Sequence, residues 1–228
     1  MKQVLNEKKN LILSSSSKSI KVLISVPCPP YGDIAGGLAD FLVRTISGGW
    51  PGITLKYDRP EDKWPAVRNL QFKRFLEISD CDKILCVDSD IIPSSNILDM
   101  VKNEVDFCSA ICFSWQFEEP FAVCMSIDSK GRDGYIQDVP SGPPGIYERD
   151  ATGLACTVIS RKLAEEFQGS FRDKFDSQGM LRRDADFDFC ERIKREGYKV
   201  YVDTRFICDH RKKIGLKRIN DLLVRKNA

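Results

Sequence analysis

The chain has 228 residues, which is the size of one large domain or of one domain with tails. Its content of 42% hydrophobic and 30% charged residues is typical of a globular protein and excludes a largely disordered, collagen-like or coiled-coil chain. The net charge of +2 gives no overall field of the kind that attracts nucleic acid, and no apolar run approaches the ~18 residues of a membrane span.

Strand-like and helix-like segments alternate in the first half of the chain. Apolar runs predict strands at 21–26, 53–57, 83–87 and 107–113. Helical spacing predicts helices at 36–46, from residue 65 onward and at 96–102. This alternation predicts a single α/β domain with a Rossmann-like, mixed and mainly parallel sheet flanked by helices.

The second half of the chain is more irregular. Residues 128–149 hold four glycines and three prolines, which favours a long functional loop or a loose hairpin. Further strands are expected at 154–159, 198–202 and 205–208, and helices at 161–167 and about 186–196. We expect a flexible lead-in at 1–19, a nucleotide-binding half at 20–113, an acceptor half at 114–213 and a basic tail at 214–228.

Nine cysteines are spread along the chain, most of them inside apolar runs. There is no CxxC pair and only one histidine, so a structural zinc site is not expected. A buried thiol behaves as a small hydrophobic group, so the pattern predicts reduced core cysteines in a reducing compartment. The apolar burst at 11–13 is too short for a signal peptide, and we expect a cytoplasmic protein without a transmembrane segment.

A pair of carboxylates follows the third predicted strand. Asp88, Ser89 and Asp90 come directly after the run 83–87, and open α/β sheets bind ligands at the carboxyl ends of their strands. Because alternate residues of a strand share a face, both carboxylates can face one crevice. Two such groups suit Mg²⁺ or Mn²⁺ held jointly with substrate phosphates. The alternative is a solvated strand end or an Asx-type turn.

The only histidine follows the last predicted strand. His210 can therefore reach the same sheet edge, and imidazole is a ligand for Mn²⁺ and other transition metals. Seven Lys and Arg residues lie among residues 211–228, which favours contact with phosphates, an anionic acceptor or a membrane surface. The alternatives are an ordinary histidine and a solvated charged face.

Three aspartates, Asp184, Asp186 and Asp188, lie at the start of the helix expected at 186–196. Capping and the helix dipole alone explain acidic residues in a first turn. One of the three can also act as a general base that takes a proton from an acceptor hydroxyl.

Taken together, residues 21 to about 213 resemble nucleotide-sugar-dependent glycosyltransferases of the GT-A fold, family-2-like, in the style of short viral and bacterial members. The matching segments are the first strand and its proline-containing loop at 22–31, the Val-Arg-Asn at 67–69, the Asp-x-Asp at 88–90, the helix start at 186–192 with the strand after it, and the late histidine at 210.

The resemblance implies a role for each matched residue. Asp90 would bind the metal ion directly and His210 would complete its shell, while Asp88 would contact the ribose or a metal-bound water. Asp186 would be the catalytic base. The remaining residues implied in nucleotide and donor binding are Pro27, Tyr31, Asp58, Arg68, Ser89, Gly153 and Lys212.

Two positions depart from the family's pattern. Ala185 stands where the family usually has Glu, which affects the carboxylate pair on the acceptor side. Only one predicted strand, at 53–57, precedes the Val-Arg-Asn segment, where longer members have two. Asp58 is therefore only a candidate for the aspartate that recognises the nucleotide base.

The implied activity is the Mn²⁺- or Mg²⁺-dependent transfer of a sugar from a nucleotide-diphosphate sugar to an acceptor hydroxyl, with inversion. A retaining route follows if Asp186 only orients the acceptor. The acceptor can be a glycan, a protein, a lipid head group, a small molecule or a modified nucleic-acid base.

Two rival functions stay open. A sugar-phosphate nucleotidyltransferase would have a glycine-rich basic loop after the first strand, and residues 27–30 lack that chemistry. If the protein were instead a non-catalytic binding module, the side chains of Asp88, Asp90 and His210 would be expected to lie apart in the fold.

Overall fold

The structure is a computed structural model, and it describes residues 20–28, 34–49, 52–58, 64–78, 80–116, 119–127 and 134–211. The predicted lead-in at 1–19 and basic tail at 214–228 lie outside these residues. Within the described part of the chain, no helix has the length and apolar character needed to cross a bilayer.

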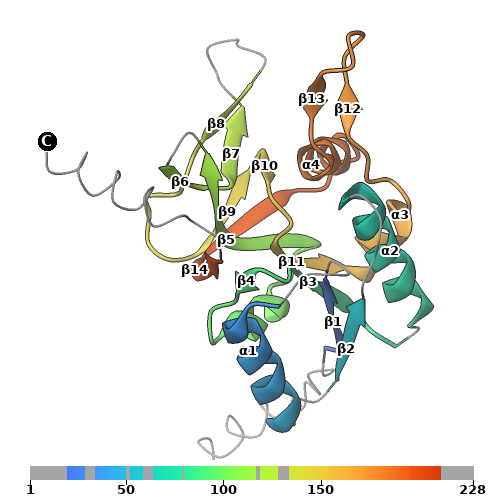
Figure 1. The fold of residues 1–228 in the computed structure, drawn as a ribbon, viewed down its shortest axis with the longest axis vertical. Helices are drawn as coiled ribbons and strands as arrows, with labels where there is room; N and C mark the ends of the chain where they lie inside the picture. The colour runs from blue at the N-terminus through green and yellow to red at the C-terminus, as the bar shows by residue number, and fades with distance from the viewer. Residues whose placement is uncertain are drawn as a thin grey trace, which may run out of the picture.

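A central sheet organises the molecule (Figure 1), and its main path has the order β2-β1-β3-β11-β5-β14-β4. Its strands are β1 (Val22–Pro27), β2 (Ile53–Asp58), β3 (Lys83–Val87), β4 (Ile91–Ile92), β5 (Phe107–Gln116), β11 (Cys156–Ser160) and β14 (Val200–His210), with β6 (Glu119–Ala122) added to β5 and β9 (Ile146–Arg149) to β14. β1 is parallel to β2 and β3, and β14 is parallel to β5. Because β11 is antiparallel to both β3 and β5, the strands β2, β1, β3, β5 and β14 all run the same way. The predicted mixed and mainly parallel sheet is confirmed.

Helices cover both faces of this sheet, because the side chains of each strand alternate between two cores. The helices are α1 (Gly36–Ser47), α2 (Trp64–Glu77), α3 (Arg161–Glu166) and α4 (Ala185–Arg195), with a 3₁₀ helix η1 at Ile97–Lys102. In β1, Val22 and Ile24 pack in the core that contains Leu38 of α1. Leu23 lies in the other core with Phe72 of α2, together with residues of α3 and α4. Alternating burial therefore fixes which helix lies on which side.

Two small sheets stand beyond the central one in Figure 1. β7 (Cys124–Ile127), β8 (Tyr135–Gln137) and β10 (Ala151–Thr152) form an antiparallel sheet, while β12 (Lys174–Phe175) pairs with β13 (Leu181–Arg183) as a ribbon. The segment 128–149 is therefore neither one loop nor one hairpin. In its described part, β8 pairs with β7 and β9 pairs with β14. The short strands gain their hydrogen bonds from partners distant in sequence, which local composition does not encode.

The last strand was expected as two strands, at 198–202 and 205–208, and is one strand with a bulge. Asp203 pairs with Ala110 and Ile207 pairs with the next residue, Ile111, so residues 204–206 have no partner on β5. Beyond this bulge, β14 pairs with β4, where His210 lies opposite Ile91. The bulge thus carries the strand on to the edge where Asp88 and Asp90 lie.

All nine cysteines are buried and free of disulfides, as the sequence predicted.

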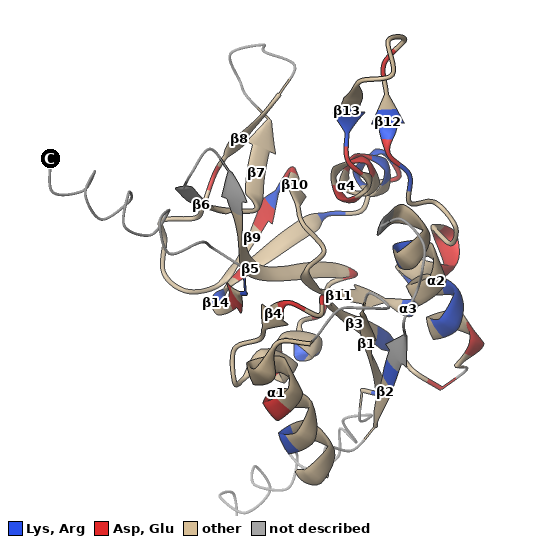
Figure 2. Cartoon of the chain, viewed as in Figure 1, with Lys and Arg blue, Asp and Glu red and all other residues tan. Residues whose placement is uncertain are grey.

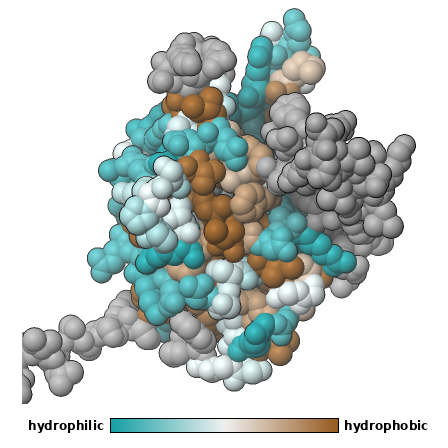
Figure 3. Space-filling view, turned by 90° about the vertical axis from the view of Figure 1, so that its left-hand side faces the viewer, coloured by the Kyte–Doolittle hydropathy of each residue, from teal (hydrophilic) through white to brown (hydrophobic). Residues whose placement is uncertain are grey.

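Charges of both signs are distributed over the whole fold (Figure 2), in agreement with the small net charge. The side of the molecule shown in Figure 3 has a band of hydrophobic surface bordered by hydrophilic residues. Exposed apolar side chains of β7, β8 and the residues that follow are Ile127, Ile136 and Val139.

Candidate active site

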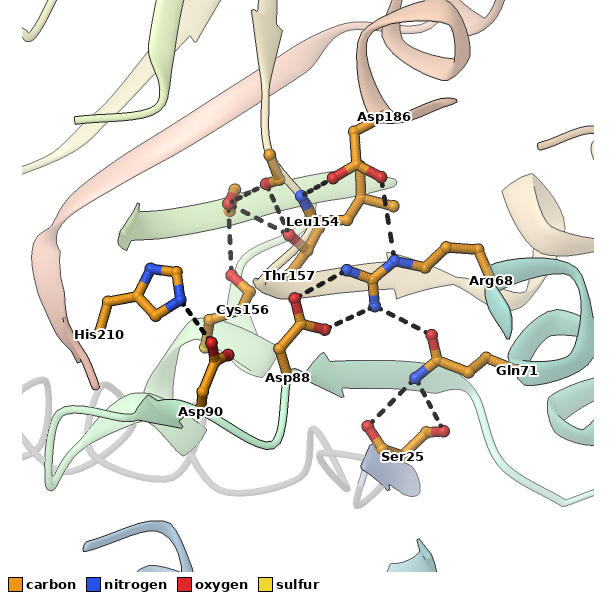
Figure 4. A network of polar contacts seen from close by, with 12 residues as sticks. Ser25, Arg68, Gln71, Asp88, Asp90, Leu154, Cys156, Thr157, Asp186 and His210 are labelled. Atoms are coloured by element: carbon orange, nitrogen blue, oxygen red, sulfur yellow. Dashed lines mark hydrogen bonds and ion pairs between the residues drawn. The ribbon is translucent and has the colours of Figure 1, made fainter. Parts of the chain in front are cut away.

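A buried arginine lies at the centre of a polar network at the carboxyl end of β3. Arg68, on α2, has a fully buried side chain. Its Nη1 lies 2.9 Å from Oδ1 of Asp88, and its Nη2 donates a hydrogen bond of 3.1 Å to Oδ2. Its Nε lies 3.9 Å from Oδ1 of Asp186 on α4. Figure 4 shows the guanidinium group between these two carboxylates, so one cation holds both in place.

Gln71 extends this network to the first strand. It lies one turn after Arg68 on the same side of α2, and its Oε1 accepts a 3.0 Å hydrogen bond from Arg68 Nη1. Its Nε2 donates to the hydroxyl and to the carbonyl oxygen of Ser25 at 3.1 and 3.3 Å. The network therefore connects β1, α2, the end of β3 and α4 (Figure 4).

Burial and neighbouring charges shift the pKa values of Asp88 and Arg68 in opposite directions. Burial raises the pKa of Asp88 to about 7, against the opposing charge of Arg68. Burial also acts to lower the pKa of Arg68, but the charges of Asp88 and Asp186 outweigh it and raise that pKa. Arg68 is therefore a permanent cation, whereas the charge of Asp88 changes near neutral pH.

The raised pKa predicts that Asp88 makes stability depend on pH. Below pH 3.8 this carboxyl is protonated in both the folded and the unfolded chain. Between pH 3.8 and about 7 the unfolded chain releases this proton first, so the contribution of Asp88 to the free energy of unfolding falls as pH rises, and it is constant above that window. Compared with the wild type, Asp88→Asn should lack this fall. Urea unfolding at a series of pH values gives the slope of the free energy of unfolding against pH for the wild type and for Asp88→Asn. Equal slopes for the two proteins would contradict the prediction.

Asp90 and His210 form a second group at the same edge of the sheet. Nε2 of His210 lies 2.9 Å from Oδ2 of Asp90, although the two residues are 120 positions apart. The side chain of Asp90 is 42% exposed and that of His210 is 14% exposed. Nδ1 of His210 contacts the carbonyl oxygen of Phe113, which can only accept, so Nδ1 carries the hydrogen. The Nε2 atom is thereby directed at the Asp90 carboxylate.

Asp186 lies in a cleft of about 330 Å³, whose lining also includes Gly153 and His210. Its Oδ2 accepts a 3.0 Å hydrogen bond from the backbone N–H of Leu154 (Figure 4), and 17% of its side chain is exposed. Asp186, the predicted base, thus lines one cavity together with His210, a predicted metal ligand, and Gly153, which is predicted to let the backbone approach the donor sugar.

The two neighbouring aspartates have other partners. Asp184 is the N-cap of α4, where its side chain accepts a 2.9 Å hydrogen bond from the N–H of Phe187. Asp188 is fully buried and forms ion pairs with Lys174 and with Arg192, whose Nε lies 2.7 Å from Oδ2. Burial acts to raise the pKa of Asp188, but hydrogen bonds from Lys174 and Arg192 outweigh it and hold that pKa below its ordinary value. Asp188 therefore stabilises the fold.

Other residues predicted to hold the donor lie at the ends of β1 and β3. Pro27 is the last residue of β1 and pairs with Asp58 at the end of β2. The carbonyl oxygen of Ser89 accepts a 2.7 Å hydrogen bond from the backbone just before α1. Tyr31, Lys212 and the side chain of Asp58 lie outside the described residues.

Gly153 lies where the chain passes between β10 and β11. A Cβ atom placed there would lie 3.2 Å from a methyl carbon of Val123 and 3.9 Å from Oδ2 of Asp186. Its carbonyl oxygen accepts a 3.1 Å hydrogen bond from Ser109. A Cβ atom at this position would therefore crowd Val123 in the wall of the cleft and would be in van der Waals contact with the Asp186 carboxylate.

Contributors to the site that were not foreseen from the sequence include Gln71, the N–H of Leu154 and the ring of Phe187, which lines the cleft. Gln71 could have been found, because it lies three positions after Arg68 on a predicted helix. The other two depend on tertiary packing and leave no local signal.

No protein-family model matches this chain, and no curated protein matches it in sequence. Similar solved structures include A197 from STIV, with a TM-score of 0.55 and 18% identity over 85% of this chain and 87% of that one. They also include GalNAc-T7 with UDP, GalNAc and Mn²⁺, with a TM-score of 0.51 and 8% identity over 87% of this chain and 45% of that one.

The inositol-1-phosphate CTP transferase from T. maritima has a TM-score of 0.47 and 9% identity over 90% of this chain and 96% of that one. The chain spans less than half of GalNAc-T7. At these identities, the likeness to A197 and GalNAc-T7 confirms the predicted fold class.

Proposed function

We propose that the protein is a metal-dependent glycosyltransferase that moves a sugar from a nucleotide-diphosphate sugar to an acceptor hydroxyl with inversion. The observation that carries this proposal is the convergence of Asp186, Gly153 and His210 in one cleft, with Asp90 2.9 Å from His210. The cleft contains a carboxylate for proton abstraction and adjoins an oxygen–nitrogen ligand pair for a cation. The likeness in fold to GalNAc-T7, whose structure contains UDP, GalNAc and Mn²⁺, supports the same reading.

The donor set of Asp90 and His210 fits Mn²⁺ better than Mg²⁺, because Mn²⁺ accepts carboxylate and imidazole ligands whereas Mg²⁺ prefers oxygen. A metal-binding histidine usually donates its other ring N–H to a carboxylate, a backbone carbonyl or a water, and Nδ1 of His210 faces the carbonyl oxygen of Phe113. In the described part of the chain, no cluster of three or more His, Cys, Asp or Glu side chains is arranged as a complete metal site. Two protein ligands are consistent with a cation that takes its other ligands from substrate phosphates and water. Such a cation would neutralise the charge of the diphosphate leaving group.

In this mechanism Asp186 is the general base. The N–H of Leu154 and the nearby Arg68 hold its carboxylate in one orientation. An acceptor hydroxyl in the cleft would donate its proton to this carboxylate while its oxygen attacks the anomeric carbon of the donor from the side opposite the diphosphate. The bond between that carbon and the diphosphate oxygen would break, and the nucleoside diphosphate would leave. Asp88 would orient the donor through its place between Arg68 and Asp90, and Pro27, Ser89 and Gly153 would shape the backbone around the nucleotide and sugar.

The metal pair is tested by binding measurements. We expect Asp90→Ala and His210→Ala to abolish the Mn²⁺-dependent part of nucleoside diphosphate binding, because each removes one of two protein ligands. Isothermal titration of a panel of nucleoside diphosphates, with and without Mn²⁺, measures this difference. Asp99→Ala is the control, because Asp99 is a surface residue that pairs with Lys102. Wild-type affinity in both site variants would contradict the metal site.

The reaction itself is tested by identifying the released product. A glycosyltransferase releases nucleoside diphosphate from a nucleotide sugar, whereas a sugar-phosphate nucleotidyltransferase releases pyrophosphate from a nucleoside triphosphate and a sugar phosphate. A binding module releases neither. The donors to be tested are the nucleotide sugars that correspond to the nucleoside diphosphates of the binding panel. Release of pyrophosphate only, or of no product with any of these donors, would overturn the proposal.

A further inference from the structure

One wall of the active-site cleft is aromatic. Phe113, Phe121 and Phe187 line it, together with Val123 and Met125. Phe113 is 38% exposed, and the rings of Phe121 and Phe187 are half-buried. A cleft that only held a diphosphate would gain nothing from exposed rings, because apolar surface in contact with water is costly. This wall therefore points to a ligand with an apolar face.

The ring of Phe187 is held in place by its neighbours. The ring of Tyr135 meets it edge to face at 5.1 Å, with an angle of 72° between the planes. The hydroxyl of Tyr135 donates a 3.1 Å hydrogen bond to Glu191, and the guanidinium of Arg183 lies 4.7 Å from the centre of the Tyr135 ring. Arg183 also forms a 2.8 Å ion pair with Glu191. Phe187 is thus a preorganised surface that loses little conformational entropy when a ligand covers it.

The polar side of the cleft contains carboxylates. Asp184 and Asp186 line it beside Ser114 and His210, and no Lys or Arg is among the described residues of this lining. A phosphorylated acceptor would place its anionic group near two carboxylates, and Arg68, which pairs with Asp186, is fully buried and outside this lining, so the contact would be unfavourable. A purely aliphatic acceptor would remove water from these carboxylates without offering them a further hydrogen-bond donor, which is unfavourable. A ligand that suits both sides has an apolar face and hydroxyl groups at its edge.

We propose that Phe187 is the platform on which an uncharged sugar ring binds as the acceptor, with one of its hydroxyls directed to Asp186. A pyranose has this combination of a C–H face, which packs on an aromatic ring, and an edge of hydroxyls that donate hydrogen bonds to carboxylates. The inference rests on the proposed glycosyltransferase function and specifies its acceptor. It makes Phe187 a specificity-determining residue.

The test separates acceptor binding from donor chemistry. Methyl glucoside, methyl galactoside, methyl mannoside and N-acetylglucosamine serve as uncharged acceptors, with glucose 6-phosphate and a short oligonucleotide as anionic ones. Release of nucleoside diphosphate from the donor without any acceptor reports donor chemistry alone. We expect at least one uncharged sugar, and neither anionic compound, to accelerate that release and to give saturation-transfer signals on binding.

Variants of Phe187 test the platform directly. Phe187→Leu keeps an apolar side chain toward the core but removes the flat ring, so we expect the KM for the sugar acceptor to rise by about 10–100-fold, which is more than any change in the rate of donor hydrolysis. Phe175→Ala removes an exposed ring on the β12–β13 ribbon, outside the lining of the cleft, and should change neither value.

Three outcomes would overturn the inference. Donor hydrolysis that only the anionic compounds accelerate would overturn the acceptor class and leave the glycosyltransferase function standing. An unchanged acceptor KM in Phe187→Leu would overturn the platform. Absence of donor hydrolysis and of transfer with every donor would overturn the proposed function, and the inference with it.

Discussion

Replacing Asp186 with asparagine should lower the turnover of sugar transfer by about 10²–10⁴-fold, with little change in affinity for the nucleotide-sugar donor. Asparagine has the same shape, and its carbonyl oxygen can still accept the hydrogen bond from the N–H of Leu154. The variant therefore keeps the geometry of the cleft but cannot take a proton from the acceptor. Steady-state kinetics with a working donor and acceptor give turnover, and titration with donor gives affinity.

Asp184→Asn is the matched control for this measurement. Asp184 lines the same cleft and caps α4, and asparagine is about as good an N-cap as aspartate. The control should therefore retain turnover and stability. Near-normal turnover in Asp186→Asn would refute the assignment of the base and would favour a retaining route. Equal losses in both variants would show that the cleft needs its charge rather than one specific base.

Replacing Asp88 with alanine should lower the free energy of unfolding by about 3–5 kcal/mol, the typical cost of removing one partner of a buried ion pair. Arg68 is fully buried, and Asp88 is the partner that approaches two of its nitrogens. Without Asp88, the nearest carboxylate described for Arg68 is Asp186, 3.9 Å from Nε. Urea unfolding at pH 8, above the raised pKa of Asp88, measures the loss, with unchanged m-values as the sign that the same states are compared.

A double variant distinguishes the contribution of the ion pair to the free energy of unfolding from the contribution of side-chain packing. Arg68→Met combined with Asp88→Leu removes both charges and keeps apolar volume, so it should recover much of the stability that Asp88→Ala loses. Asp99→Ala, which breaks an exposed pair with Lys102, should change the free energy of unfolding by less than about 1 kcal/mol. A cost for Asp88→Ala as small as that of Asp99→Ala would show that the buried pair does not govern stability.

The location of the candidate site could be predicted from the sequence because short apolar runs mark where strands end. The runs before Asp88 and before His210 placed both residues at strand ends, and parallel strands bring such ends to one edge of a sheet. The 2.9 Å approach of Asp90 and His210 follows from this rule and from the pairing of β14 with β4.

The partners within the site could not be predicted in the same way. Asp88 and Asp90 are two residues apart, yet one faces the buried Arg68 and the other faces His210. Periodicity states which positions share a face but not which distant side chain meets them. The same holds for Phe187, which sequence spacing marks only as a helical apolar residue and whose ring, in the wall of the cleft, packs against Tyr135 of the sheet β10-β7-β8.

The bulge in β14 has a consequence for how this chain tolerates changes in length. Asp203 and Ile207 pair with consecutive residues of β5, so the bulge inserts residues 204–206 between them, which is an odd number of residues. Side chains alternate along a strand, so an odd insertion exchanges the two faces for all residues that follow it. Gain or loss of a single residue here would turn the imidazole of His210 away from Asp90, although every residue of the site would still be present. Homologous chains that differ in length at this bulge are therefore poor guides to each other's chemistry, even where their motifs align.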